Sequence, residues 1–333
     1  RFPMMITPYY LSLVDPKDPD DPIGRMCIPS LDEFDPGGSF DTSGEASNTK
    51  MEGLQHKYAQ TVLLLSTNQC AMYCRHCFRK RMVGLSEDEL NRRVDEAVAY
   101  VKSHETVTNI LITGGDAFMN SNGIIRRYLE ELTAIPRLDF IRFGSRIPVT
   151  LPERIYGDQE FLDMFAHYAQ KKALYLVTQF NHPRELTEEA VRAVRAMIER
   201  GVQVRNQTVL LRGVNDSGEV LGKLLGKLTR VGIAPYYIFQ CRPVTGVKER
   251  FQVPIEEGIR IVDAAKSRQN GFGKSVRYAM SHPRGKIEIV CRLPNGETVF
   301  KFHQSKDDAD MARPFTRVLR PTDTWLDGEL NGI

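Results

Sequence analysis

The stretch "TVLLLSTNQCAMYCRHC" at residues 61–77 joins an apolar run directly to three closely spaced cysteines. Residues 61–67 are mostly branched aliphatic side chains and therefore predict a short buried strand. The cysteines follow at positions 70, 74 and 77, which is a C-x3-C-x2-C spacing, and no fourth cysteine lies near them in the sequence. Thiols in this pattern can bind a metal, form disulfides or pack as small apolar groups.

The same strand-then-helix pattern repeats six times between residues 61 and 271. The expected strands cover residues 61–67, 108–116, 140–146, 173–180, 202–211 and 234–241, and the expected helices cover residues 86–104, 123–135, 159–171, 187–201, 218–232 and 255–271. The first of these helices begins with a capping box formed by Ser86 and Glu89. Consecutive βα units predict an α/β fold with a parallel sheet, either doubly wound or curled into a barrel.

The two flanks of this repeat have a different character. Residues 1–55 are rich in Pro, Asp and Gly, and they predict an extended arm that wraps the main domain. Residues 286–303 predict a hairpin that turns at Asn295 and Gly296. The final residues show no clear pattern.

Composition excludes several classes of protein. The chain has 333 residues, 41% hydrophobic and 26% charged, and a net charge of +3, which is too small to predict a nucleic-acid or membrane partner. No apolar run approaches the roughly 18 residues that span a bilayer. Six cysteines in a chain of this length do not predict a disulfide scaffold, so we expect a cytoplasmic protein.

Polar side chains and glycines gather at the carboxyl ends of the six expected strands. In barrels and in open parallel sheets alike, the active site lies at this edge. The residues found there are Asn68, Gln69, Gly114, Asp116, Ser145, Arg146, Gln179, His182, Arg212, Asn215, Gln240 and Arg242.

The number of cysteines in the loop helps to distinguish which kind of metal site they could form. Zinc sites usually present four ligands, whereas thiolates also hold iron–sulfur clusters. Three thiolates suit a [4Fe–4S] cluster with one iron left open for another ligand. The alternative is that Cys70, Cys74 and Cys77 are structural.

These cysteines after a first strand resemble the signature of the radical S-adenosylmethionine superfamily, and "TGGD" at 113–116 resembles its glycine-rich turn. The resemblance implies a partial (β/α)6 TIM-like barrel at residues 56–290, with an N-terminal arm at 1–55 and a C-terminal extension at 291–333. It also implies that S-adenosylmethionine binds the open iron and contacts Gly114, Gly115, Asp116, His182 and Gln207. An external electron donor such as flavodoxin or ferredoxin would then be needed.

Longer segments resemble the lysine 2,3-aminomutase family, an isomerase family. They include "CAMYCRHCFRKRMVG", "GSRIPVTLPERI", "FNHPREL", "TVLLRGVND" and "PYYIFQC", in the family's order, and the match covers residues 6–290. This resemblance implies that a 5′-deoxyadenosyl radical abstracts the substrate Cβ hydrogen. The imine of pyridoxal phosphate then carries the amino group from C2 to C3, giving a β-amino acid. The family forms dimers or tetramers.

The resemblance assigns the cofactor residues one at a time. Lys286, in "HPRGKIEI", matches the lysine that forms the Schiff base; the alternative is a solvated lysine at the start of a strand. Lys57 and Tyr58 match residues that bind the phosphate. Thr61 stands where the family has a further phosphate-binding arginine, which weakens the case for pyridoxal phosphate.

Three residues bear on the substrate. Arg79 matches the arginine that binds the substrate carboxylate, and a guanidinium suits this role because it pairs bidentately with carboxylates. Arg242 and Ser281 occupy the positions of two aspartates that hold the side-chain ammonium of lysine. We therefore expect that lysine is not the substrate and that an acidic amino acid such as glutamate or aspartate is. The alternative is that Arg242 pairs with a structural carboxylate.

Three other functions compete with this expectation. A family member could have changed its reaction and lost pyridoxal phosphate, as Thr61 would allow. An enzyme that modifies a lysine destined for a protein is a second alternative, and the long arm and absent aspartates count against it. A non-catalytic metal-binding module is the third.

Overall fold

The computed structural model describes residues 2–84, 90 and 94–333. In this part of the chain one sheet of twelve strands pairs in sequence order from β1 to β12. Its central strands are parallel to one another, and they are β3 (Thr61–Thr67), β4 (Asn109–Gly114), β5 (Phe140–Gly144), β6 (Ala173–Thr178), β7 (Gln203–Leu210), β8 (Ala234–Gln240) and β9 (Arg277–His282).

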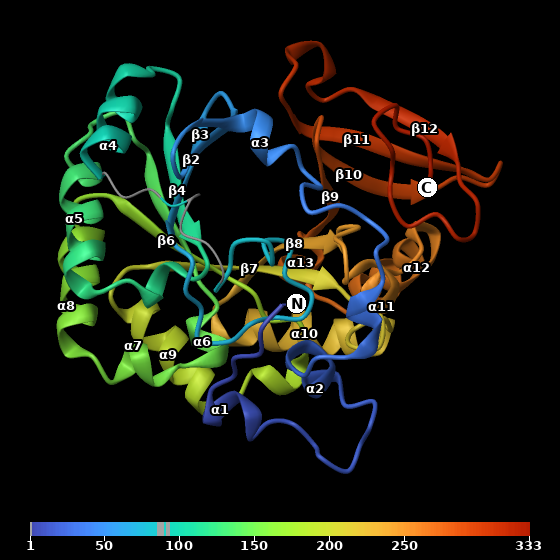
Figure 1. The fold of residues 1–333 in the computed structure, drawn as a ribbon, viewed down its shortest axis with the longest axis horizontal. Coiled ribbons are helices and arrows are strands. Elements are labelled where there is room, and N and C mark those ends of the chain that lie inside the picture. Colours follow the sequence, from blue (N-terminus) through green and yellow to red (C-terminus); the bar gives the residue numbers. More distant parts are fainter. Residues whose placement is uncertain (1, 85–89, 91–93) are drawn as a thin grey trace.

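The strand order decides between the two architectures that the sequence allows. A doubly wound sheet reverses its order at a switch point, which places helices on both faces. Here each parallel strand pairs with the next one in sequence, so right-handed crossovers place the connecting helices on one face. Figure 1 shows these helices along the outside of the curved sheet. The prediction of a partial barrel is confirmed, and β9 adds a parallel strand beyond the six that were expected.

The barrel remains open because its end strands pair elsewhere. β3 pairs antiparallel with β2 (Leu54–Tyr58), and β9 pairs antiparallel with β10 (Gly285–Arg292). The sheet thus continues through the expected domain boundaries at 55/56 and 290/291, which fall inside these two strands.

The outer helices form because each presents an apolar stripe to the sheet. In α9 (Glu188–Glu199) the buried residues Ala190, Ala193, Val194 and Met197 follow helical spacing, and Thr187 caps the first turn. The other long helices are α4 (Val94–Ser103), α5 (Asn122–Thr133), α8 (Gln159–Ala169), α10 (Gly218–Val231) and α12 (Ile255–Ser267). The expected capping box at Ser86 and Glu89 lies outside the described residues.

Shorter helices occupy the loops. They are η2 (Ala117–Met119), α6 (Ile147–Thr150), α7 (Glu153–Tyr156), η3 (Pro183–Glu185), α11 (Lys248–Phe251), α13 (Gly271–Lys274) and η4 (Asp308–Asp310). None of the helices in the described ranges is long and apolar enough to cross a membrane.

The N-terminal arm packs along the barrel, as expected, and carries short elements. These are α1 (Pro8–Leu11), α2 (Pro22–Cys27), η1 (Leu31–Phe34), α3 (Glu45–Asn48) and β1 (Thr49–Met51). The Tyr10 hydroxyl donates to Glu185 in η3, and Glu33 pairs with Arg75 of the cysteine loop. Figure 1 shows the arm passing from α1 and α2 at one end of the view to α3 at the other.

The C-terminal extension is an antiparallel continuation of the sheet. β10 and β11 (Glu297–Ser305) form the predicted hairpin, and Gly296 in its turn has a φ of 90°, a value that favours glycine. β12 (Pro314–Val318) then pairs with β11. This last strand was not predicted.

Candidate active site

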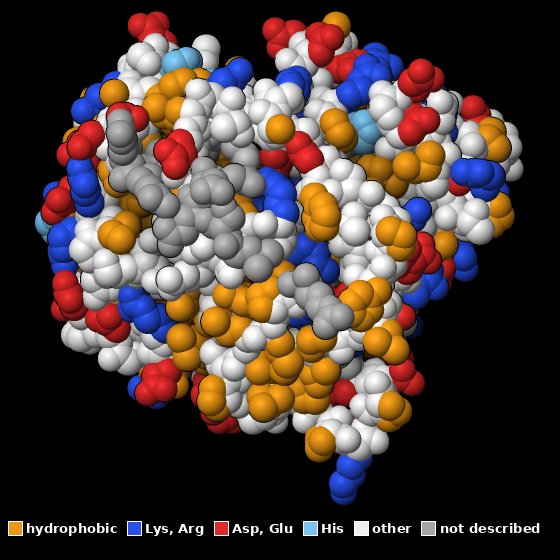
Figure 2. Space-filling model, in the orientation of Figure 1, with side chains coloured by type: hydrophobic (Ala, Val, Ile, Leu, Met, Phe, Trp, Pro, Cys, Tyr) orange, Lys and Arg blue, Asp and Glu red, His pale blue; other side chains and the backbone are white. Residues whose placement is uncertain are grey.

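A cavity of about 820 Å³ lies inside the curved sheet. The cysteine loop lines it at the carboxyl ends of the parallel strands, and inward-facing residues such as Thr61, Asn109 and Arg205 line it at their amino ends. Among the described lining residues there are seven Lys and Arg side chains and one carboxylate, Asp116. Basic side chains are visible in the hollow in the middle of the face drawn in Figure 2. The cavity therefore favours anionic occupants.

The three predicted cluster ligands, Cys70, Cys74 and Cys77, line one end of this cavity and are partly buried. All six cysteines are free, so the disulfide alternative fails. No three His, Cys, Asp or Glu side chains in the described ranges converge on a single metal ion. Separated thiols facing one cavity fit a cluster, since its cysteine ligands bind different iron atoms.

The glycine-rich turn after β4 packs against the start of the cysteine loop. A Cβ atom on Gly114 would lie 2.2 Å from the carbonyl oxygen of Thr67, and one on Gly115 would lie 2.3 Å from that of Gln69. Gly114 also has a φ of 128°. Both positions require glycine, so the turn and the loop can lie together along the cavity wall.

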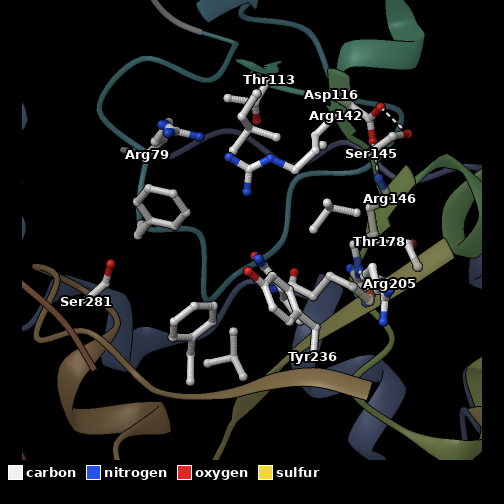
Figure 3. Close-up of a pocket in the computed structure, with 18 of the residues that line it drawn as sticks. Arg79, Thr113, Asp116, Arg142, Ser145, Arg146, Thr178, Arg205, Tyr236 and Ser281 are labelled. Carbon is white, nitrogen blue, oxygen red and sulfur yellow. Dashed lines mark hydrogen bonds between the residues drawn. The ribbon is translucent and has the colours of Figure 1, made fainter. Parts of the chain in front are cut away.

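The Asp116 carboxylate is used to hold this edge of the sheet. It accepts hydrogen bonds from the backbone N–H of Phe118 at 3.0 Å, the Ser145 hydroxyl at 2.6 Å and the backbone N–H of Arg146 at 2.6 Å (Figure 3). Burial raises the pKa of Asp116 to about 6, and these hydrogen bonds oppose that rise. The carboxylate thus joins β4 to β5 beneath the predicted S-adenosylmethionine site.

Arg146 connects the cysteine loop to η3 and to the arm. One Nη atom lies 3.0 Å from the Cys74 sulfur, and the other pairs with Glu185 and contacts the Tyr10 hydroxyl. The side chain is almost fully buried. The guanidinium thus places a positive charge beside one of the predicted cluster ligands.

Of the other two residues predicted to contact S-adenosylmethionine, only one lines the cavity. Gln207 on β7 lines the cavity. His182 does not appear in the lining; it caps η3 and its backbone N–H donates to Glu185. Gln179, the first residue after β6, faces the cavity instead.

Lys286 lies on β10 with its ammonium in the cavity, 4.3 Å from the centre of the Tyr237 ring. Burial, together with the positive charges of Arg142, Lys57 and Arg242, lowers its pKa to about 7. A lysine that loses its proton near neutrality is suited to attack an aldehyde. The alternative of a solvated strand-start lysine does not describe this environment.

Of the two residues predicted to bind a phosphate, again only one lines the cavity. Tyr58 lines the cavity, but the Lys57 ammonium donates to the carbonyl oxygens of Ser43 at 3.2 Å and His282 at 2.5 Å. Lys57 thus joins the arm to the segment before Lys286, and it is absent from the cavity lining.

The predicted substrate residues come together on one wall. The guanidinium carbons of Arg79 and Arg242 lie 4.5 Å and 4.0 Å from the centre of the Phe78 ring. Arg242 donates to the Ser43 hydroxyl at 2.9 Å, and in the described part of the chain no carboxylate lies within 4.0 Å of it. Ser281 lines the same cavity, and Figure 3 shows it on the side of Arg79.

The arm supplies a carboxylate that does not line the cavity but contacts Arg79 of this wall. Glu45 on α3 lies 3.6 Å from Arg79 and 2.5 Å from Arg81, measured from Oε to the nearest guanidinium nitrogen. Burial raises the pKa of Glu45, but the charges of Arg79, Arg242 and Arg81 outweigh it and hold the pKa below its usual value.

The sequence interpretation missed three basic residues inside the cavity, Arg142, Arg205 and Arg277. Arg142 on β5 and Arg205 on β7 both face inward, where Figure 3 shows Arg142 pointing toward the middle of the cavity. The sequence did contain a signal for Arg142, which is a charged residue within an otherwise apolar strand. It lies two residues before Gly144, and side chains two apart in a strand point to the same face, here the inner one.

Comparison with known proteins agrees with this arrangement. Residues 64–224 match the family model described as "Radical SAM superfamily". A protein of Aquifex aeolicus (strain VF5), provisionally named an L-lysine 2,3-aminomutase, is 39% identical over 98% of this chain and 87% of its own length.

Two further relatives differ in the substrate that they are named for. The L-lysine 2,3-aminomutase of Clostridium subterminale is 40% identical over 81% of this chain and 64% of its own length. The glutamate 2,3-aminomutase of Clostridioides difficile (strain 630) is 34% identical over 86% of this chain and 66% of its own length.

Radical SAM enzymes use a [4Fe–4S] cluster and S-adenosylmethionine, and lysine 2,3-aminomutases also use pyridoxal phosphate. The fold, the cysteine loop and these identities together show that the chain belongs to the lysine 2,3-aminomutase family of the radical SAM superfamily.

Proposed function

We propose that the chain is a 2,3-aminomutase for an amino acid with an acidic side chain. The observation that carries this proposal is a pair of guanidinium groups, those of Arg79 and Arg242, which both contact the ring of Phe78. An α-carboxylate can pair with Arg79 while a side-chain carboxylate pairs with Arg242. The ammonium of lysine would instead meet a buried cation, which is unfavourable.

The remaining site residues support the same reaction. Cys70, Cys74 and Cys77 would hold the cluster, and Gly114, Gly115 and Gln207 would contact S-adenosylmethionine. When bound, the cluster and S-adenosylmethionine supply hydrogen-atom abstraction, and pyridoxal phosphate supplies an aldehyde that carries the migrating amine.

Lys286 fits the cofactor aldehyde because its amine is neutral above about pH 7 and faces the cavity. Reduction of the cluster would require an external one-electron donor of the flavodoxin or ferredoxin class.

A second candidate function keeps the radical chemistry and omits pyridoxal phosphate. Thr61 and the carbonyl contacts of Lys57 favour it, since neither residue brings a positive charge to the cavity. An absorbance band at about 420 nm after addition of pyridoxal phosphate, lost in Lys286→Ala, would favour the aminomutase. A reconstituted protein without this band would favour the second candidate.

The decisive experiment is a substrate screen of the reconstituted enzyme with glutamate, aspartate, lysine and neutral amino acids, with detection of the β-amino product. We expect turnover of an acidic substrate. The double variant Arg242→Asp/Ser281→Asp should lower kcat/KM for that substrate by roughly 100-fold and raise it for lysine, because the charge facing the side chain is inverted.

Arg230→Asp is the matched control, because Arg230 lies exposed on α10 outside the barrel. It should leave the substrate preference unchanged. Turnover of lysine by the unaltered enzyme, with none of an acidic amino acid, would refute the proposed substrate class.

A further inference from the structure

The residues expected to bind the cofactor phosphate do not provide a cation to the cavity. Thr61 replaces an arginine, and its hydroxyl accepts a hydrogen bond from the Asn109 side-chain amide at 3.1 Å. Lys57 is bound to the backbone carbonyls of Ser43 and His282. If pyridoxal phosphate binds here, its doubly charged phosphate needs another partner.

Arg142 has the properties of that partner. Its Nη2 donates to Oδ1 of Asn109 at 2.6 Å, whereas its Nε is buried and has no hydrogen-bond partner. No Asp or Glu in the described ranges pairs with it within 4.0 Å. A guanidinium held in a cavity without a counter-ion is costly, and an anionic ligand would remove that cost.

Asn109 places Arg142 beside the position that lost its arginine. The Asn109 side chain bonds both to Thr61 on β3 and to Arg142 on β5, so one amide joins the two sites across the intervening strand. At this end of the cavity the cation therefore lies on β5 and not on β3.

Arg142 is also within electrostatic range of the lysine that would hold the cofactor aldehyde. After burial, its charge has the largest effect among those that lower the pKa of Lys286. In pyridoxal phosphate the aldehyde and the phosphomethyl group are on neighbouring ring carbons. A ligand joined to Lys286 therefore carries its phosphate close to the lysine nitrogen, in the region that the Arg142 charge reaches.

We propose that Arg142 binds the phosphate of pyridoxal phosphate in this chain, in place of the arginine that Thr61 replaces. This inference rests on the proposed function. It makes Arg142 a binding residue and assigns Asn109 the task of orienting it.

The test compares pyridoxal phosphate with pyridoxal, which lacks the phosphate, in titrations of the cluster-reconstituted protein at about 420 nm. Arg142→Gln should weaken binding of pyridoxal phosphate roughly 10- to 100-fold, the range expected for a lost charge-assisted contact. Its affinity for pyridoxal should change less than about threefold. Adding Thr61→Arg to the Arg142→Gln variant should recover much of the lost affinity, because it returns a cation to the original strand.

Arg205→Gln is the matched control, since Arg205 lines the same cavity but has Gln203 as a partner at 3.4 Å. It should change neither affinity by more than about threefold. Arg142→Lys, which keeps the charge, should retain more affinity than Arg142→Gln, and it serves if the latter does not fold.

Three outcomes would overturn the inference. Unchanged pyridoxal phosphate affinity in Arg142→Gln would refute the role of Arg142 while leaving the proposed function intact. An equal loss for pyridoxal would show a general effect on the fold and would also refute it. No band in the unaltered protein would refute both the inference and the aminomutase proposal.

Discussion

Glu45 of the N-terminal arm and Arg79 of the cysteine loop face each other with 3.6 Å between Oε1 and Nε, and both side chains are only 8% exposed. The carboxylate also binds Arg81 at 2.5 Å. A segment more than thirty residues away in sequence thus places a buried carboxylate beside the arginine that we propose binds the substrate. The arm is therefore part of the site rather than a peripheral cover.

Removing the charge of Glu45 should destabilise the fold. Glu45→Gln leaves buried arginines without their counter-ion, and we expect the free energy of unfolding to fall by about 3 kcal/mol at pH 7.5, measured by urea denaturation. Because the pKa of Glu45 is lowered in the folded state, its contribution is present above its usual pKa and is lost as the pH falls through the folded-state value.

The control for this change is an exposed ion pair of similar geometry. Arg126 and Glu160 lie 2.9 Å apart with side chains that are 39% and 64% exposed. Glu160→Gln should cost much less than Glu45→Gln, because water screens an exposed ion pair. Equal costs for the two variants would contradict a buried role for Glu45.

Lys286 should react with aldehydes at a lower pH than an ordinary lysine. Its pKa of about 7 means that the neutral amine forms as the pH rises through 7, instead of near 10.4 for a free lysine side chain. Borohydride trapping of pyridoxal phosphate, followed by peptide mapping, should show half-maximal labelling of Lys286 near pH 7. Parallel labelling of N-acetyl-lysine provides the reference, and a labelling midpoint that coincides with it would contradict the prediction.

Arg146 should tune the cluster potential. A cation 3.0 Å from the Cys74 sulfur favours the more negative, reduced cluster. Arg146→Gln should therefore lower the midpoint potential by on the order of 50 mV, close to a tenfold change in the reduction equilibrium. The measurement is a redox titration followed by electron paramagnetic resonance, at equal iron content.

Arg154→Gln, which removes an ion pair with Asp158 at the surface of the barrel, should leave the potential unchanged. A more positive potential in Arg146→Gln would show that its charge does not act on the cluster in this way.

Gly115→Ala should disturb binding of S-adenosylmethionine. The new methyl group would lie 2.3 Å from the carbonyl oxygen of Gln69, so the cysteine loop must move. We expect at least about a tenfold loss of affinity, measured by equilibrium dialysis of the reconstituted protein. Gly123→Ala is the control, because its Cβ would meet nothing closer than the Ser121 hydroxyl at 3.9 Å. Equal affinities in the two variants would contradict the close approach of turn and loop.

The barrel could be predicted because its signals are local. Each strand and helix carries its own apolar periodicity, and the cysteine loop follows the first strand without interruption. The hairpin at Gly296 was equally readable, since a turn depends on adjacent residues. β9 and β12 were missed because their stability comes from pairing with β8 and β11. Such pairing depends on the assembled sheet and leaves no signal in the local sequence.

The candidate site was predictable only in part. Cys70, Cys74, Cys77, Arg79 and Lys286 line the cavity as expected, but His182 and Lys57 do not. For Lys57 the reason is that two backbone carbonyls from distant segments satisfy its ammonium. No pattern around residue 57 shows those partners.

The sequence by itself determined the order of strands and helices, the cysteine spacing and the family. It did so because hydrophobic periodicity and motif spacing are properties of short segments. Only the tertiary structure decided which charges meet: Glu45 with Arg79, Arg242 with Phe78, and Arg142 with Asn109 beside Thr61. These contacts join residues far apart in the chain, and the energy of each depends on burial that exists only after the sheet has curved around the cavity.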